Sequence, residues 1–323
     1  MNAKNIISAI LMVLSFAACS SDIEGLDDNM TNTSANNGET SISVRMTTDG
    51  ISTKSNDQSG LAINNFVIAV FEAASGQRIG YADNNSNVSG GAVTEVKVVD
   101  IDTKEGLVNV VVVANAGIDQ FKNIYTYEEF GNQIVRDNLN DLVKVGTTTQ
   151  SLSKDGKNKV DIKLSQLTAR VKVDLKYETT GVIADDNVTV SFTATNYSYN
   201  AATASTILNP ENNAENLKGQ DFSKNSVNAS SFYYDTYRMN NPELSVTTSL
   251  SVTVKGTVVK EGETKVAVPF TCGSDVLRCL ENGKVYTQVI TVKINFNISR
   301  PTDVTLEYEV APVREIENEI TFG

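Results

Sequence analysis

Cys19 is the residue whose type and surroundings point most directly to a chemical modification. It follows Lys4, an apolar segment over residues 6–14, and small residues that end in Ala17-Ala18. The apolar segment is too short to cross about 30 Å of hydrocarbon as a helix, and small residues before a cysteine suit the cleft of a signal peptidase. The sequence therefore predicts a lipoprotein signal over residues 1–19, which leaves Cys19 as a lipid-modified N-terminus. An ordinary secretory signal with an incidental cysteine is the alternative.

The two remaining cysteines, Cys272 and Cys279, have six residues between them. An exported protein meets oxidising conditions, so a disulfide across this short loop is one interpretation. Two separate thiols packed as small apolar groups are the other, because sequence does not fix the Cα separation that a disulfide requires. The pair lacks the Cys-x-x-Cys spacing of redox and metal sites.

Composition argues against most catalytic chemistry. The chain has 39 acidic and 27 basic residues, a net charge of −12 and no histidine. Without histidine it lacks the usual general base near pH 7 and the commonest zinc ligand, and its acidity gives no electrostatic basis for binding nucleic acid. The acidic pair Asp185-Asp186 precedes a strand pattern and is typical of a turn. We therefore expect no catalytic residue, no cofactor and no metal site.

The segment after Cys19 divides into a tether, a strand and a loop. Residues 20–39 are polar and poor in large apolar side chains, so they cannot offset their ordering entropy by burial. Residues 40–48 alternate, with Ile42, Val44 and Met46 on one face, which predicts a half-buried strand. Residues 49–60 are rich in Gly, Ser, Asn and Asp and contain one base, Lys54, which predicts an exposed loop.

Short valine-rich segments continue through the chain and predict an all-β fold. Strands are expected at 65–71, 93–99, 107–114, 159–164, 169–177, 188–195, 244–259, 264–270, 285–298 and 304–310. One helix is expected at 126–145, where Thr126 and Glu129 form a capping-box pair. About 300 residues after the signal suffice for two domains, which we expect at 40–166 and 167–323.

Several of these segments, in their order, resemble the fimbrillin family, the subunits of type V pili of Bacteroidales. The resemblance extends over almost the whole chain, from Cys19 to the region after Asn282. Its other segments are Thr40-Ser41-Ile42-Ser43-Val44, Phe66-Val67-Ile68-Ala69-Val70-Phe71, Val110-Val111-Val112-Val113-Ala114-Asn115-Ala116-Gly117, Leu167-Thr168-Ala169-Arg170-Val171, Asn282-Gly283-Lys284-Val285-Tyr286 and Val289-Ile290-Thr291-Val292. The resemblance implies two transthyretin-like β-sandwich domains, with the short helix in the first, and a precursor cut by a trypsin-like protease and polymerised by strand exchange.

The resemblance also implies roles for particular residues. The strand with Ile42, Val44 and Met46 would be the removable one, and Lys54 would be the cleavage site, ahead of Arg45, which the alternation places inside the strand. The donor would come from the C-terminal segment, whose apolar residues alternate: Val304, Leu306, Tyr308, Val310, Ile316, Ile320 and Phe322. Pairing of residues 304–310 within their own domain is the alternative to donation.

The implied function is a structural subunit of a cell-surface pilus that supports adhesion. Its partners would be copies of itself or related subunits, the processing protease, and the outer membrane, which the lipid on Cys19 would hold before processing. The alternatives are a tip adhesin of the same pilus and a monomeric surface lipoprotein that binds glycans through its β-sandwiches; an enzyme ranks third. Six of the seven aromatic residues within 196–242 would either form a ligand-binding loop or pack on the sandwich: Tyr197, Tyr199, Phe232, Tyr233, Tyr234 and Tyr237.

Overall fold

The structure is a computed structural model and is all-β, as predicted. It describes residues 40–48, 62–84, 95–136, 139, 141–154, 158–181, 187–209, 220–226, 230–272, 275–297, 300–311 and 314–316. These residues belong to one compact unit, 37–323, so the division into domains at residue 166 stays a prediction. The strands themselves form two β-sandwiches, and Leu167 lies between the last strand of the first sandwich and the first strand of the second.

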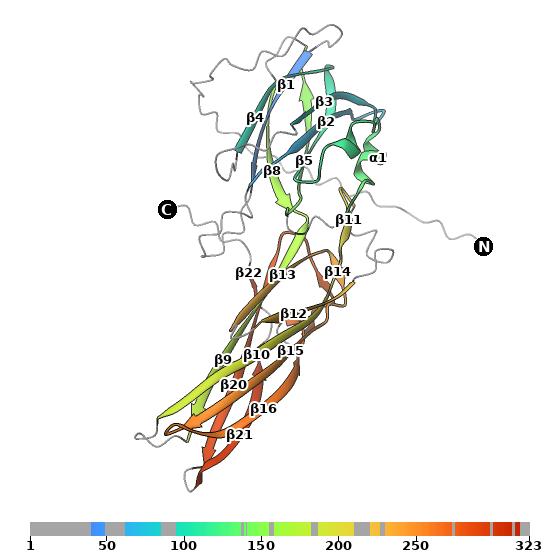
Figure 1. Ribbon diagram of the computed structural model, residues 1–323. Coiled ribbons are helices and arrows are strands. Elements are labelled where there is room, and N and C mark those ends of the chain that lie inside the picture. The colour runs from blue at the N-terminus through green and yellow to red at the C-terminus, as the bar shows by residue number, and fades with distance from the viewer. Residues whose placement is uncertain are drawn as a thin grey trace, which may run out of the picture. The chain divides into compact units, whose positions relative to one another are not determined.

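The first sandwich is a seven-stranded sheet in the order β3-β2-β5-β7-β8-β1-β4 (Figure 1). Its strands are β1 Thr40–Thr48, β2 Phe66–Glu72, β3 Arg78–Asn84, β4 Glu95–Thr103, β5 Gly106–Ala114, β7 Lys144–Leu152 and β8 Asn158–Gln166. Strands β7 and β8 share only two residue pairs, Lys144 with Gln166 and Val145 with Ser165. Beyond them the two strands cross closely: a Cβ on Gly146 would lie 2.5 Å from Ile162 Cγ2. The sheet therefore folds over on itself at this point.

Strands β2 and β5 are buried on both faces, as their continuous apolar sequences predict. One face contributes Ile68, Val70, Val110 and Val112 to a core between the two halves of the folded sheet. The other face contributes Val67, Phe71 and Val113 to a second core, which also contains Phe121 and Phe130. The 3-10 turn Asp119–Phe121 and helix α1 Tyr127–Gly131 cover this second face.

The helix predicted at 126–145 is wrong beyond its first turns. Its start is confirmed, because the Thr126 side chain accepts a hydrogen bond from the Glu129 amide at 3.2 Å. Helix α1 then ends at Gly131, β6 Ile134–Arg136 pairs with β11 Ala204–Thr206, and Leu142 has a φ of +51°. Strand pairing and a left-handed residue thus override a helix-like apolar spacing, and β7 occupies the end of the predicted helix.

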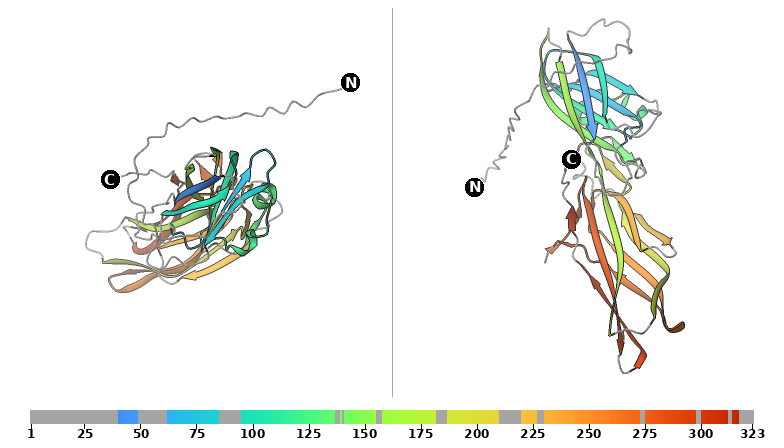
Figure 2. Two further views of the ribbon diagram at one scale, coloured as in Figure 1. Left: turned by 90° about the horizontal axis from the view of Figure 1, so that it is seen from above. Right: turned by 90° about the vertical axis from the view of Figure 1, so that its left-hand side faces the viewer.

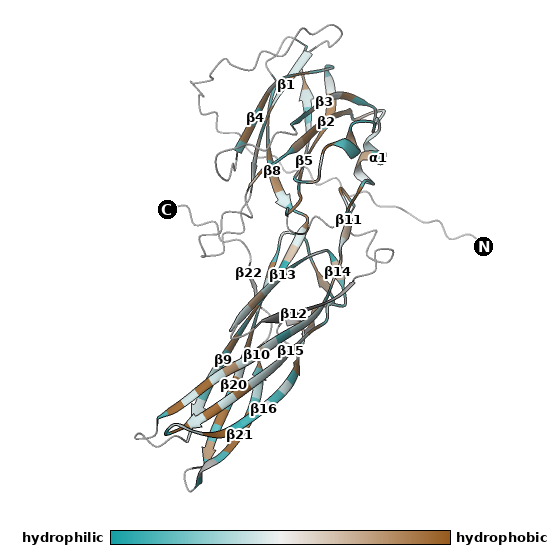
Figure 3. Cartoon of the chain, in the orientation of Figure 1, coloured by the Kyte–Doolittle hydropathy of each residue, from teal (hydrophilic) through white to brown (hydrophobic). Residues whose placement is uncertain are grey.

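The second sandwich packs two antiparallel-rich sheets face to face. One has the order β12-β10-β15-β16 and the other β13-β9-β20-β21, with β22 also paired to β20. The strands are β9 Thr168–Thr180, β10 Val188–Ala201, β12 Gln220–Ser226, β13 Ser231–Tyr237, β15 Leu244–Val254, β16 Thr257–Ala267, β20 Val285–Asn297, β21 Arg300–Val310 and β22 Arg314–Ile316. Hydropathy alternates along the strands of this region in Figure 3, because one face of each sheet points into the core.

The strand predicted at 244–259 is a hairpin. Lys255 and Gly256 both have positive φ, 52° and 79°, as a two-residue I′ turn requires, so β15 ends before them and β16 begins after them. Three further short pairs complete the described strands: β6 with β11, β14 Met239–Asn240 with β19 Cys279–Leu280, and β17 Thr271–Cys272 with β18 Asp275–Val276.

The aromatic residues of 196–242 mostly pack on the second sandwich. Tyr197, Phe232, Tyr234 and Tyr237 are buried. Tyr199 stacks on Tyr234 with ring centroids 4.1 Å apart. Tyr233 points outward and is 55% exposed. Packing on the second sandwich is therefore confirmed for Tyr197, Tyr199, Phe232 and Tyr234, whereas Tyr237 belongs to the core that contains Phe71 and Phe121. The stretch contains strands β11 to β14 in addition to the end of β10.

Candidate functional site

Strand β1 lies inside the sheet and is hydrogen-bonded along both of its sides. It runs parallel to β8 on one side, with Val44 opposite Val160, and antiparallel to β4 on the other, with Val44 opposite Val98. In Figure 2, β1 is the blue strand of the first sandwich. Strand β1 lies between β8 and β4 in the strand order. Loss of β1 would therefore leave a gap between β8 and β4 of roughly two strand spacings, about 10 Å.

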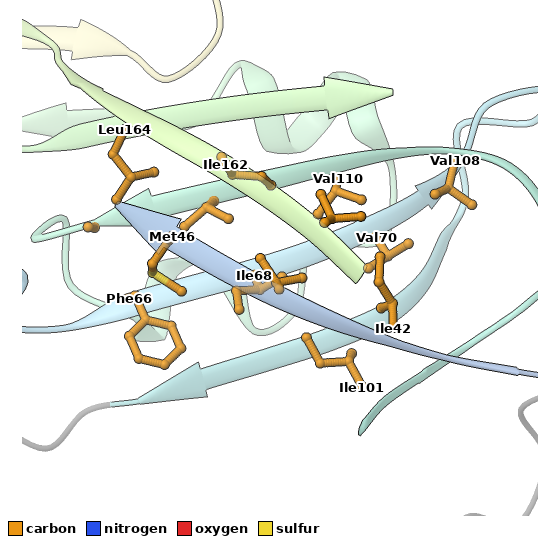
Figure 4. Packing of buried hydrophobic residues seen from close by; sticks show 14 of the residues in the cluster. Ile42, Met46, Phe66, Ile68, Val70, Ile101, Val108, Val110, Ile162 and Leu164 are labelled. Carbon is orange, nitrogen blue, oxygen red and sulfur yellow. The ribbon is translucent and has the colours of Figure 1, made fainter. Parts of the chain in front are cut away.

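The inward side chains of β1 complete the first core, as the alternation predicts. Ile42, Val44 and Met46 are 0%, 1% and 0% exposed. Figure 4 shows Ile42 and Met46 among side chains of β2, β4, β5 and β8, and the same cluster includes Ile101, Ile162 and Leu164. Burial of each such side chain contributes roughly 1.5–3 kcal/mol in gross terms. The sequence thus identified the three residues that a groove left by β1 would lack.

The outward face of β1 carries an exposed ion pair. Arg45 lies 3.0 Å from a Glu95 carboxylate oxygen and 3.9 Å from Asp161. The hydrogen bond from Arg45 lowers the pKa of Glu95 below its usual range. Pairs as exposed as this one contribute little to stability. Arg45 lies within a strand that is hydrogen-bonded on both sides, as the alternation predicts.

Asn158 holds the beginning of β1 against the turn between β7 and β8. Its Nδ2 donates to Thr40 Oγ1 and to the Ser41 carbonyl, each at 3.0 Å, and its Oδ1 accepts from the Ser153 amide at 3.0 Å. Thr40 Oγ1 in turn donates to the Ser153 carbonyl at 2.9 Å. Sequence reasoning missed this contact, since an asparagine at the start of a strand looks like any turn residue.

A second polar cluster, also missed, anchors the chain just before β2. Lys144 is fully buried, and its Nζ donates to the carbonyl oxygens of Ala62 at 3.1 Å and Leu142 at 2.9 Å. Asn115 Nδ2 donates to the same Ala62 carbonyl at 2.9 Å, and its Oδ1 accepts from the Asn64 amide at 2.8 Å. We use the name "clasp" for Lys144, Asn115 and the segment 62–65, which these two side chains bind.

A partial signal for the clasp exists in the sequence. Asn115 directly follows the valine-rich strand, where asparagine often takes a left-handed conformation, and its φ is +65°. Lys144 gave no such signal, because nothing in its local sequence marks a buried lysine. Its burial depends on the tertiary crossing of β7 with β8.

The C-terminal segment pairs within its own chain. Strand β21 pairs antiparallel with β20, Val304 opposite Phe296 and Val310 opposite Ile290, and β22 continues along the same side of β20. Val304, Leu306 and Tyr308 pack in the second sandwich, and Val310 packs against its core. This pairing describes a single chain and does not test donation between chains. The side chain of Ile316 and the residues Ile320 and Phe322 lie outside the described residues.

Several other predicted sites also lie outside the described residues. They are Cys19, Lys54 and the side chain of Cys272. Cys279 is described, and its Sγ donates to the Leu280 carbonyl at 3.6 Å. Lipidation, cleavage and the pairing of the two cysteines stay predictions. Among the helices described here, none is both long and apolar enough to cross a membrane.

These features define an all-β protein of two sandwiches with a buried first strand. No protein-family model matches the chain, and no curated protein does so either. Solved structures do. The fimbrilin FimA of Porphyromonas gingivalis W83 has a TM-score of 0.52 at 12% identity, over 85% of this chain and 98% of that chain.

Two further structures are similar at comparable levels. The tip fimbrial protein Mfa3 of Porphyromonas gingivalis, solved with a C-terminal truncation, has a TM-score of 0.52 at 12% identity, over 84% of this chain and 98% of that chain. A fimbrial assembly protein of Parabacteroides distasonis ATCC 8503 has a TM-score of 0.50 at 21% identity, over 86% and 98%. At these identities the likeness establishes a shared fold, and it confirms the fold that the fimbrillin resemblance implied.

Proposed function

We propose that this chain is a structural subunit of a cell-surface pilus, exported as a lipoprotein precursor and polymerised by strand exchange after proteolysis near Lys54. The observation that carries the proposal is the position of β1: an interior strand with three buried side chains, followed by a segment that contains a single base. The fold shared with fimbrial proteins supports the same function.

Proteolysis would turn β1 from a covalent part of the sheet into a bound peptide. The cut adds no contact and removes none, but it gives the strand the entropy of a free molecule. When β1 leaves, the facing backbone groups of β4 and β8 lose their partners, and the apolar side chains around Ile101 and Ile162 are exposed. A strand from another molecule would restore both kinds of interaction.

The C-terminal tail after β22 is the better donor within the C-terminal segment. Strand β21 is paired with β20 over most of its length and contributes Val304 to the buried core, so its donation would open the second sandwich. The tail continues the apolar alternation with Ile320 and Phe322 and can be donated without that loss. Head-to-tail exchange of this kind is heterologous and builds open filaments.

The glycan-binding alternative has less support. Sugar rings stack on exposed aromatic faces, whereas four of the six aromatic residues considered for a ligand-binding loop are buried and Tyr199 stacks on Tyr234. The proposal accordingly assigns the chain no catalytic residue and no cofactor. Adhesion would be a property of the filament, with lipid on Cys19 anchoring the precursor in the outer membrane.

Limited digestion tests the proposal directly. The lipid-free precursor (Cys19→Ser) is treated with trypsin and followed by intact mass and by size exclusion with light scattering. We expect one early cut after Lys54, then loss of the fragment that contains β1 and growth of oligomers. A Lys54→Gln variant should stay uncut and monomeric under the same conditions. A wild-type chain that is cut after Lys54 and remains a monomer would refute strand exchange.

A further inference from the structure

The clasp stands at the junction between the part of the chain that the proposed function removes and the part that remains. Residues 62–65 precede β2 and belong to no strand, so the sheet ladder does not satisfy their backbone groups. Side chains and turns do so instead. Besides the Lys144 and Asn115 side-chain bonds, the Asn115 amide donates to the Asn65 carbonyl at 3.0 Å. The segment is therefore held from the side of β5 and β7, independently of β1.

Burial of the Lys144 ammonium has a desolvation cost that its hydrogen bonds must offset. The ammonium donates to two backbone carbonyls, and no carboxylate among the described residues lies within ion-pair distance of it. A methionine would fill similar space without the desolvation cost of a charge. The donors of Lys144 and Asn115 converge on one acceptor, the Ala62 carbonyl, four residues before β2 begins at Phe66.

The second support of this segment is apolar and depends on β1. Ile63 is 1% exposed and belongs to the same core cluster as Ile42, Val44 and Met46. Departure of β1 would remove three members of that cluster at once. The clasp contains no β1 residue, so its hydrogen bonds would persist when the apolar support is weakened.

We propose that Lys144 and Asn115 are positioning residues that stop unfolding at Ala62 when β1 leaves, so that β2 stays in place and the emptied groove keeps its shape. This inference rests on the proposed function, because it concerns the state after β1 has gone. The clasp would make the body of the subunit a preformed receptor for the incoming strand.

Hydrogen exchange on the trypsin-treated, lipid-free precursor tests the clasp. The test variant is Lys144→Met with Asn115→Gly, since methionine keeps the length of the side chain and glycine tolerates the positive φ. In the wild type we expect the amides of Asn64 and Asn115 to stay protected after β1 is lost. In the double variant the protection of the amides at positions 64 and 115 should fall at least tenfold, and the loss of protection should spread into β2.

Val108→Ala is the matched control, because it removes buried volume from the same core without touching the clasp. The inference would be overturned if this control lost amide protection in β2 to the same extent, or if protection in the double variant were unchanged. Size exclusion measures release of the β1 fragment, and this release tests the proposed function separately. If that fragment stays bound, the proposed function fails. The clasp is then judged on the amides at positions 64 and 115 in the uncut chain, where the double variant must still lose protection tenfold.

Discussion

Lys144 combines full burial with two carbonyl partners, and this gives it a measurable titration. Burial lowers the pKa of its ammonium from 10.5 to about 8. Between these values the unfolded chain binds more protons than the folded chain, so the free energy of unfolding rises with pH across this window, by at most about 1.4 kcal/mol per pH unit. We expect urea denaturation to show this rise for the wild type from about pH 8 upward, relative to Lys144→Met.

The matched control for this titration is Lys104→Met, at an exposed lysine that follows β4. Relative to Lys104→Met, the wild type should show little change in stability over the same pH window, because both chains retain Lys144. A difference between wild type and Lys144→Met that stays constant from pH 7 to 10 would show that the lysine is not desolvated in the folded state.

Substitutions on the inward and outward faces of β1 should differ strongly in their effect on stability. Ile42→Ala empties a fully buried position and should lower the free energy of unfolding by about 2–5 kcal/mol, whereas Ser43→Ala on the outward face should change it by less than about 0.5 kcal/mol. After the trypsin cut, Ile42→Ala should also release the β1 fragment faster. Urea denaturation and timed size exclusion measure the two effects, and similar release rates for both variants would contradict the role of inward burial.

Periodicity predicted the elements whose structure is determined locally. Strand β1 has the bounds that its alternation gave, 40–48, and the apolar segments near β2 and β5 lie in buried strands. Strand β3 was missed because Arg78 to Asn84 has little apolar alternation and depends on pairing with β2. The helix at 126–145 failed for the same kind of reason, since β6 and β7 are fixed by partners distant in the sequence.

The candidate site was predictable only in its apolar half. Ile42, Val44 and Met46 follow from a period of two, which a single segment displays. The polar contacts at its two ends do not, because Asn158 and Lys144 act on backbone groups of Ser41 and Ala62, more than 80 residues away in the chain. No spacing rule connects residues so far apart, and only the folded sheet brings them together.

At the scale of the whole molecule, strand exchange requires that each chain carry both a groove and a donor. In the proposed mechanism, proteolysis would control the groove, because β1 fills it in the uncut chain, whereas the C-terminal tail would be present before and after the cut. An uncut chain would then be able to donate but not to accept. A cut chain without the tail would be able to accept but not to donate. Mixing the two should stop assembly at a pair, whereas filaments form only when one chain does both.

This asymmetry gives a test of the donor. A variant that ends at Ile316 keeps every described strand and lacks Ile320 and Phe322. After its trypsin cut and loss of the β1 fragment, we expect it to remain a monomer alone and to form one-to-one pairs with added uncut Lys54→Gln chain, as measured by light scattering. Full-length cut chain should give larger oligomers under the same conditions. If the cut truncated variant polymerises as readily as the full chain, the tail is not the donor, and β21 becomes the segment to test next.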